Sequence, residues 1–241
     1  MKTKYFLILL AITFTVSLNA QKLSPVATFE ENPITHNVHI CFDGKNYFTI
    51  NGGKPETGMI NKYDLEFKLL KTYKIDLDMR SIMYEPKEGK LYVCTHEGNI
   101  YKITDIATGK FEFLKDSVYG DVQSSITLSP DGKMLYAFNK GKLRIYKFPS
   151  CKLLKILNGF DSGKTAKTGG CVVAVDRTHI YTWNTEYKII FIYNLKGKKI
   201  KSVEIKDGDY GYSLSSANGL IFVSTDGNYD TGKWYGYDLW K

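Results

Sequence analysis

The chain of 241 residues is 43% hydrophobic and 14% aromatic, and it carries 33 Lys and Arg against 25 Asp and Glu, a net charge of +8. This length suits one domain and is short for two domains of ordinary size. The 18 Tyr favour β-strands, because aromatic rings pack well on a half-buried pleated surface. Acids and bases are interspersed through most of the chain. This argues against nucleic acid as a partner, because nucleic-acid-binding proteins gather basic residues on one face.

The N-terminus has the layout of a secretory signal peptide. Lys2 and Lys4 precede an apolar stretch, residues 5–16, that is too short to span a bilayer, and the small residue Ala20 stands where the cut would fall. We expect cleavage near Ala20, which removes residues 1–20 and leaves a bacterial protein that is periplasmic or secreted. An uncleaved anchor helix is the alternative. After cleavage we expect no transmembrane segment, because no later run is long enough.

Residues 21–241 are dominated by a unit of about 44 residues that occurs five times. Each unit has a polar turn, most clearly Asp131-Gly132-Lys133, followed by a strand-like run such as Leu135-Tyr136-Ala137-Phe138. Self-similarity at this period, with four short strands in each unit, is typical of a radial array. The sequence therefore predicts an all-β fold with almost no helix: one five-bladed β-propeller domain of four-stranded antiparallel blades.

The fifth unit is incomplete. It stops at Lys241, where other units continue into an outer strand, and an unpaired sheet edge invites aggregation. The segment from Lys22 to Glu30 matches the outer strands in length and apolar content, and Pro25 is tolerable on an outermost strand. We expect this N-terminal strand to complete the last blade and close the ring.

Two units carry a family resemblance. The segment 128–136 (LSPDGKMLY) and, less sharply, the segment 84–93 (YEPKEGKLYV) resemble the S-P-D-G-K-x-L-Y-V core of YVTN-type and related bacterial β-propellers. Proteins with such repeats include surface-layer components, binding proteins, redox-associated propellers and lactonases. The resemblance therefore implies an architecture far more than an activity.

Four cysteines, Cys41, Cys94, Cys151 and Cys171, fall in different units and share no short metal-type spacing. Export would permit disulfides. Three of the four lie in apolar strand patterns, however, where a free thiol acts as a small core residue. The sequence leaves their disulfide state open.

Propellers usually place ligands on the rim where outer strands lead into inner strands and second strands lead into third strands. Acids precede three inner strands there, and basic, amide and aromatic residues surround them; the candidates are His36, Asp78, Arg80, Asp121, Gln123, Trp183, Asp209, Tyr210 and Tyr212. Carboxylates beside Arg and Tyr suit a cationic or polyhydroxylated ligand. The plainer interpretation is that each Asp only caps its own turn.

One loop resembles a calcium site in its spacing. Asp226, Asn228 and Asp230 stand at alternate positions, as oxygen ligands do in a calcium loop. The glycine comes one place late for an EF-hand, and the twelfth position, Tyr237, holds no acid. A polar turn is the favoured interpretation and calcium the alternative; we predict no other cofactor.

Together these patterns favour a monomeric binding or scaffolding module that engages a protein, glycan or small-molecule ligand through its rim. The alternative is a propeller hydrolase, a metal-dependent lactonase or a glycoside-cleaving enzyme, that uses the rim carboxylates. The inner strands are poor in acids, and the usual local catalytic signatures are absent from the sequence. We therefore assign no catalytic residue and favour binding.

Overall fold

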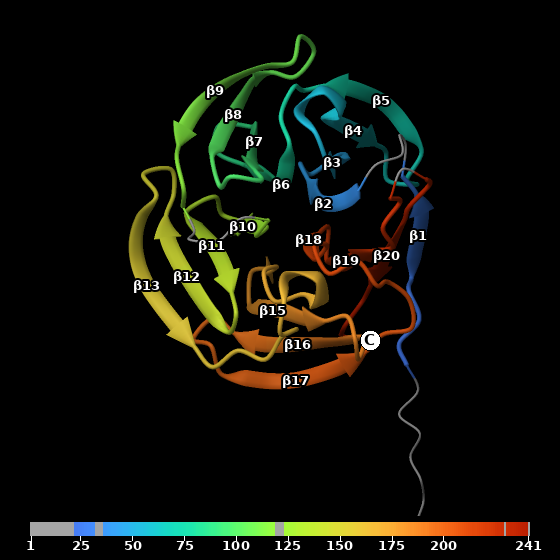
Figure 1. Cartoon of the computed structure of the whole chain (residues 1–241), viewed down its shortest axis with the longest axis vertical. Coiled ribbons are helices and arrows are strands. Elements are labelled where there is room, and N and C mark those ends of the chain that lie inside the picture. The colour runs from blue at the N-terminus through green and yellow to red at the C-terminus, as the bar shows by residue number, and fades with distance from the viewer. Residues whose placement is uncertain (1–21, 32–35, 119–122, 229, 241) are drawn as a thin grey trace, which may run out of the picture.

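The structure is a computed structural model that describes residues 22–31, 36–118, 123–228 and 230–240. Five four-stranded antiparallel sheets surround one axis, so the predicted five-bladed β-propeller is confirmed (Figure 1). The described residues form no helix beyond two short 3-10 turns, η1 (Pro55–Thr57) and η2 (Ala166–Thr168). The described residues include no helix that is long and apolar enough to cross a membrane.

Each blade runs from an inner strand near the axis to an outer strand at the surface. Blade 1 consists of β2 (His36–Phe42), β3 (Tyr47–Gly52), β4 (Met59–Tyr63) and β5 (Leu69–Lys74). Blade 2 consists of β6 (Met79–Glu85), β7 (Lys90–Thr95), β8 (Ile100–Asp105) and β9 (Lys110–Lys115). Blade 3 consists of β10 (Ile126–Leu128), β11 (Met134–Asn139), β12 (Lys142–Lys147) and β13 (Lys152–Asn158). Blade 4 consists of β14 (Ala174–Val175), β15 (His179–Asn184), β16 (Ile189–Asn194) and β17 (Lys199–Glu204). Blade 5 consists of β18 (Ser215–Ala217), β19 (Leu220–Ser224), β20 (Lys233–Tyr237) and β1 (Ala27–Glu30).

The repeated polar turn separates each inner strand from the second strand. In blade 1 the Asp43 carboxylate accepts hydrogen bonds from the backbone N–H groups of Lys45 (2.8 Å) and Asn46 (2.7 Å). Such a bond from Asp to its own following backbone fixes the turn locally. In blade 3 the turn passes through Gly132 at φ +72°, a conformation that residues with a Cβ rarely adopt.

The hydrophobic core consists of five wedges, one between each pair of neighbouring blades. The largest fully buried side chains lie in them: Trp183 and Tyr181 between blades 4 and 5, and Trp234 and Tyr63 between blades 5 and 1. Burying a large apolar side chain stabilises a fold by about 1.5–3 kcal/mol. All four cysteines are buried in the structure as free thiols, so no disulfide joins them.

The N-terminal strand closes the ring, as the sequence predicted. β1 is the outer strand of blade 5 and pairs antiparallel with β20, from Ala27 opposite Gly236 to Glu30 opposite Lys233. The ladder starts two residues after Pro25, whose ring nitrogen has no proton to donate. Earlier still, Leu23 forms a parallel bridge with Ile205 at the end of blade 4.

Glu31, directly after β1, ties the closing strand to the first blade. Its side chain is only 2% exposed. Its carboxylate accepts hydrogen bonds from Asn61 Nδ2 (2.8 Å) and Tyr63 Oη (2.6 Å) of β4, and from Trp234 Nε1 (2.6 Å) of β20. Burial raises the pKa of Glu31, against the opposing effect of these donors. Blades 5 and 1 therefore share one buried carboxyl group.

Candidate functional site

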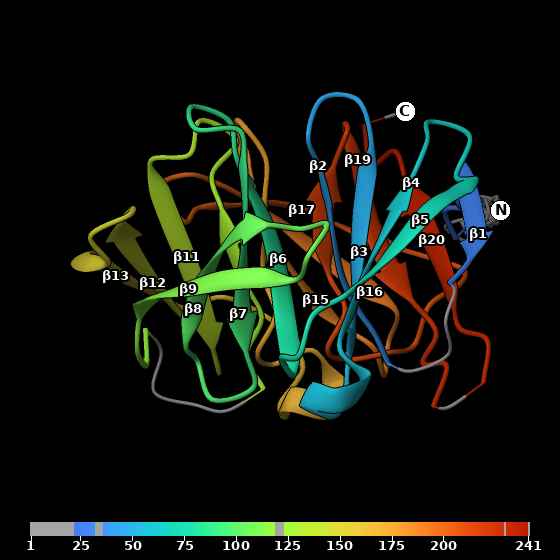
Figure 2. The ribbon, with the colours of Figure 1, turned by 90° about the horizontal axis from the view of Figure 1, so that it is seen from above.

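The ring has two faces that differ in their loops. We call the face where outer strands lead into inner strands, and second into third strands, the loop rim. The turns between inner and second strands form the opposite face, which we call the turn face. Both 3-10 turns lie on the loop rim, at the lower edge of Figure 2.

Asp78 and Arg80 form an ion pair on the loop rim at the start of β6. Arg80 Nη1 lies 2.6 Å from Asp78 Oδ1, and Nη2 lies 3.2 Å from Oδ2, so the contact is bidentate. The same carboxylate accepts the backbone N–H of Gly53 (3.0 Å). The guanidinium lies over Gly52, where a Cβ would meet Nη1 at 2.2 Å. Asp78 therefore positions Arg80 rather than offering a free carboxylate.

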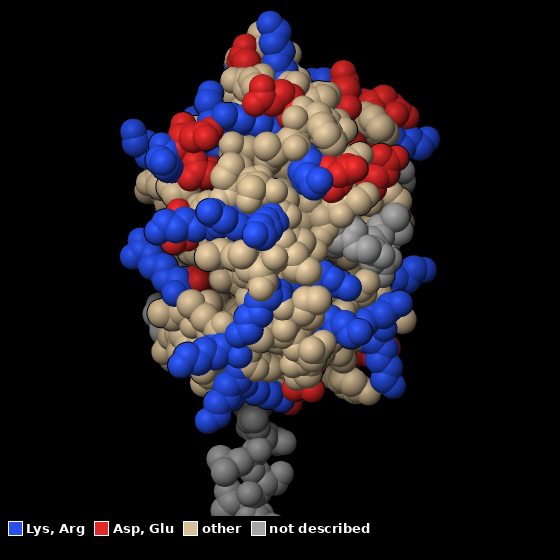
Figure 3. Space-filling model, turned by 90° about the vertical axis from the view of Figure 1, so that its left-hand side faces the viewer, with Lys and Arg blue, Asp and Glu red and all other residues tan. Residues whose placement is uncertain are grey.

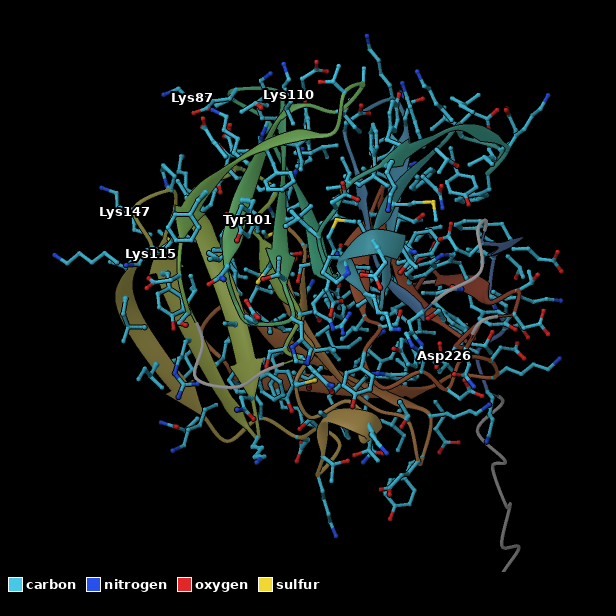
Figure 4. All side chains as sticks on the ribbon, turned by 45° about the horizontal axis from the view of Figure 1, so that its top comes forward. Lys87, Tyr101, Lys110, Lys115, Lys147 and Asp226 are labelled. Atoms are coloured by element: carbon cyan, nitrogen blue, oxygen red, sulfur yellow. The ribbon has the colours of Figure 1, made fainter. Side chains whose placement is uncertain are left out.

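A second cluster joins blade 1 to blade 5 on the same face. His36 Nδ1 lies 2.8 Å from Asp226 Oδ1, and the two side chains are about one-quarter exposed. The His36 ring is stacked on Tyr210, with centroids 6.0 Å apart and planes at 14°, and Tyr210 contacts Tyr212 at 5.4 Å. We call His36, Tyr210 and Tyr212 the aromatic cluster. Asp226 is labelled in Figure 4, on the side of the ring away from Lys115 and Lys147.

The ion pair and the aromatic cluster share one electrostatic environment. Burial raises the pKa of the Tyr210 phenol, and the Asp226 charge raises it further, whereas the Arg80 charge acts in the opposite direction. Burial also raises the pKa of Tyr212, again opposed by Arg80. Both phenols therefore stay protonated at neutral pH and can donate hydrogen bonds.

The remaining candidates lie in different environments, and one lies outside the described residues. Trp183 is fully buried in the wedge between blades 4 and 5, so its ring does not reach the surface of the rim. Gln123 is half-buried and is held through its backbone, whose N–H donates to His96 O (3.3 Å). Asp209 is exposed. Asp121 lies outside the described residues.

The loop proposed for calcium is organised around His36. Asp226 Oδ1 accepts both His36 and the backbone N–H of Asn228 (3.1 Å), while the Asn228 and Asp230 side chains are exposed. Within the described ranges, no three or more His, Cys, Asp or Glu side chains form a group that could hold a metal ion. Binding of a cation here would have to compete with His36 for the same carboxylate.

A cavity of about 760 Å³, with no counterpart among the sequence-based predictions, opens on the turn face. All five inner strands and their turns line it, because it is the mouth of the central channel. His39, 2% exposed, lies in its wall and donates from Nδ1 to Ile82 O (3.0 Å). Burial lowers the pKa of His39 to about 4, so the imidazole is neutral and Nε2 is an acceptor. Nothing among the described residues bonds to that nitrogen.

Comparison with known proteins supports the fold and leaves the family open. No family model and no curated protein matches the chain. Among solved structures, glutaminyl cyclase from Myxococcus xanthus is similar, with 10% identity, a TM-score of 0.62 and coverage of 90% of this chain and 99% of that one. A chain of a nidogen/laminin complex is similar with 14% identity, a TM-score of 0.53 and coverage of 77% of this chain and 70% of that one. At such identities the likeness concerns the fold alone, and this chain is a propeller repeat protein.

Proposed function

We propose that this protein is an exported, monomeric binding module whose loop rim engages a polyhydroxylated ligand such as a glycan. The observation that carries the proposal is the pairing of the rim charges. Asp78 is ion-paired with Arg80, and Asp226 accepts a hydrogen bond from His36, so both carboxylates are already engaged and the aromatic cluster stands beside them. Export rests on residues 1–20, which lie outside the described ranges.

The chemistry of this group suits a sugar. Aromatic faces bind the apolar faces of sugar rings, and phenol and guanidinium protons donate to hydroxyl oxygens. Arg80 uses three of its N–H groups on Asp78 and the Met79 carbonyl, which leaves others for a ligand. Bidentate contact with Asp78 fixes the guanidinium beforehand, which lowers the entropic cost of binding.

The hydrolase alternative requires a carboxyl group that is free to transfer protons or attack a substrate. Of the two paired rim acids, Asp78 accepts three hydrogen bonds and Asp226 accepts two. The oxygens of both carboxylates are therefore already occupied by donors, which leaves them poorly placed to take a proton from water or a substrate. The pairing therefore favours binding over hydrolysis at these positions.

A glycan microarray probed with the chain from residue 21 onward tests the proposal. We expect retention of a subset of glycans, with binding that falls roughly tenfold in Tyr210→Ala and survives in Tyr210→Phe, because the ring supplies the contact. Tyr187→Ala is the matched control, since Tyr187 is a 66% exposed loop-rim tyrosine between β15 and β16 of blade 4 and is not part of the aromatic cluster. Absence of glycan binding, together with turnover of a lactone or aryl glycoside, would establish the hydrolase instead.

A further inference from the structure

Charge is distributed unevenly once the blades are assigned. Residues 124–206, which form blades 3 and 4, contain 16 Lys and Arg and 5 Asp and Glu, a net charge of +11. The remainder after residue 20 contains 15 basic and 20 acidic residues, a net charge of −5. The interspersed pattern noted along the sequence therefore does not hold in space, and two adjacent blades form a basic half of the ring.

The basic residues of this half are largely without acidic neighbours. Among the described residues, only Lys133 and Lys199 of the sixteen have a carboxylate oxygen within 4.0 Å. In Figure 3, which views the ring from the side of β9 and β13, red atoms gather toward the upper part and blue atoms dominate the lower part. An uncompensated field of this kind attracts anionic partners over about 10 Å at moderate salt.

The outer strand of blade 3 adds apolar side chains to this field. Leu153, Leu154 and Ile156 of β13 are 45%, 49% and 45% exposed, and Lys152 and Lys155 of the same outer strand are exposed as well. We call these five residues the β13 face. Lys147 is paired with Lys152, and both Lys147 and Lys115 of the neighbouring blade are labelled at the left of Figure 4.

We propose that the β13 face docks the protein on a lipid bilayer surface that contains anionic lipids. Lysines attract anionic headgroups, and aliphatic side chains between them gain stability by entering the boundary between headgroups and acyl chains. A soluble polyanion would satisfy the lysines and leave the leucines in water. Lysines on an outer strand can also serve only to prevent the strand from pairing with another chain. Exposed leucine and isoleucine side chains would favour such pairing, so this explanation does not account for them.

Co-sedimentation with vesicles tests this inference on the whole chain from residue 21 onward. The probes are vesicles of phosphatidylcholine alone and of phosphatidylcholine with phosphatidylglycerol, at about 0.1 M and about 0.5 M salt. We expect binding only to the anionic vesicles, weakened at the higher salt. The substitutions Lys147→Gln, Lys152→Gln and Lys155→Gln together should weaken it on the order of a hundredfold, since each lysine near an anionic surface contributes about fivefold.

Two comparisons make the test decisive. The matched control carries Lys45→Gln, Lys54→Gln and Lys68→Gln, an equal change in net charge on exposed residues of blade 1, and should bind almost as wild type. A third variant, Leu153→Thr, Leu154→Thr and Ile156→Thr, keeps strand-forming side chains and should lose vesicle binding while it retains any binding to dextran sulfate. Equal losses in the two lysine variants would overturn the proposal, as would vesicle binding that the threonine variant retains in full, since the face would then be a site for polyanions.

Discussion

The ring closure makes a strong prediction about Glu31. Replacing it with alanine removes the acceptor of three donors that lie in the wedge between blades 5 and 1. A buried donor left without a partner costs about 1–3 kcal/mol, and relief of the burial cost of the carboxyl group offsets part of the sum. We expect Glu31→Ala to lower the free energy of unfolding by about 3–5 kcal/mol, a large part of the total for a domain.

Urea unfolding followed by tyrosine and tryptophan fluorescence measures this change. Glu30→Ala is the matched control, because Glu30, the last residue of β1, is the neighbouring acid, and its side-chain ion pair among the described residues is an exposed contact with Lys233 at 3.4 Å. Exposed ion pairs contribute about 0–1 kcal/mol, so the control should unfold almost as wild type. Equal, small effects of the two substitutions would refute the view that Glu31 fastens the ring.

The pH dependence tests which force dominates at Glu31. Its pKa is raised by burial above the ordinary 4.5, so the folded state holds its proton at a pH where the unfolded state has lost it. The contribution of this proton uptake to the free energy of unfolding is complete below pH 4.5 and is lost as the pH rises through the pKa of Glu31 in the folded state. Glu31→Gln does not titrate, so the gap in stability between wild type and this variant should narrow as the pH rises. A gap that widens would show that the three donors outweigh burial.

Three further outcomes follow from the geometry. Burial lowers the pKa of His39 to about 4, so the neutral imidazole contributes to the free energy of unfolding in full above pH 6.5. This contribution is lost as the pH falls toward 4. His39→Gln should therefore reduce the loss of stability on the acid side of a pH–stability curve by about 3 kcal/mol. Gly211→Ala places a Cβ 1.9 Å from Lys167 O, so it should lower the free energy of unfolding by about 1–3 kcal/mol and weaken glycan binding by displacing the flanking tyrosines; unchanged melting and binding would contradict this. Calcium should leave the melting temperature unchanged, because Asp226 is already held by His36; a rise in scanning calorimetry would restore the calcium interpretation.

The blade architecture could be predicted because local sequence determines it. Each Asp-Gly-Lys turn and the alternating run after it form within a few residues, and repetition shows five such units without reference to contacts across the ring. The closing strand followed from a count of missing strands, and pairing of β1 with β20 confirms it. The turns and strands of a blade depend on interactions within one unit. The closing strand depends on the fact that β20 would otherwise have an unpaired edge.

The site was harder to predict because it depends on which loops meet across the axis. The sequence selected His36, Arg80 and Tyr210 by their place at the start of inner strands, but nothing local shows that Asp226 reaches His36 over 190 positions. Trp183, near the end of the second strand β15, was also selected, but its side chain is fully buried in the core. The turn-face cavity could not be predicted, because inner-strand residues in its wall such as Ile40 and Ala217 would suit any buried strand, and nothing local shows that the five inner strands meet there.

Closure and site are connected through the same junction. Glu31 bonds β4 of blade 1 to β20 of blade 5, and His36, at the start of β2, reaches Asp226 and Tyr210 across that same pair of blades. The relative position of the two blades therefore sets the geometry of the aromatic cluster. Loss of the Glu31 hydrogen bonds between blades 5 and 1 should weaken ligand binding under conditions where the blades themselves remain folded. Local opening at one junction requires less free energy than global unfolding.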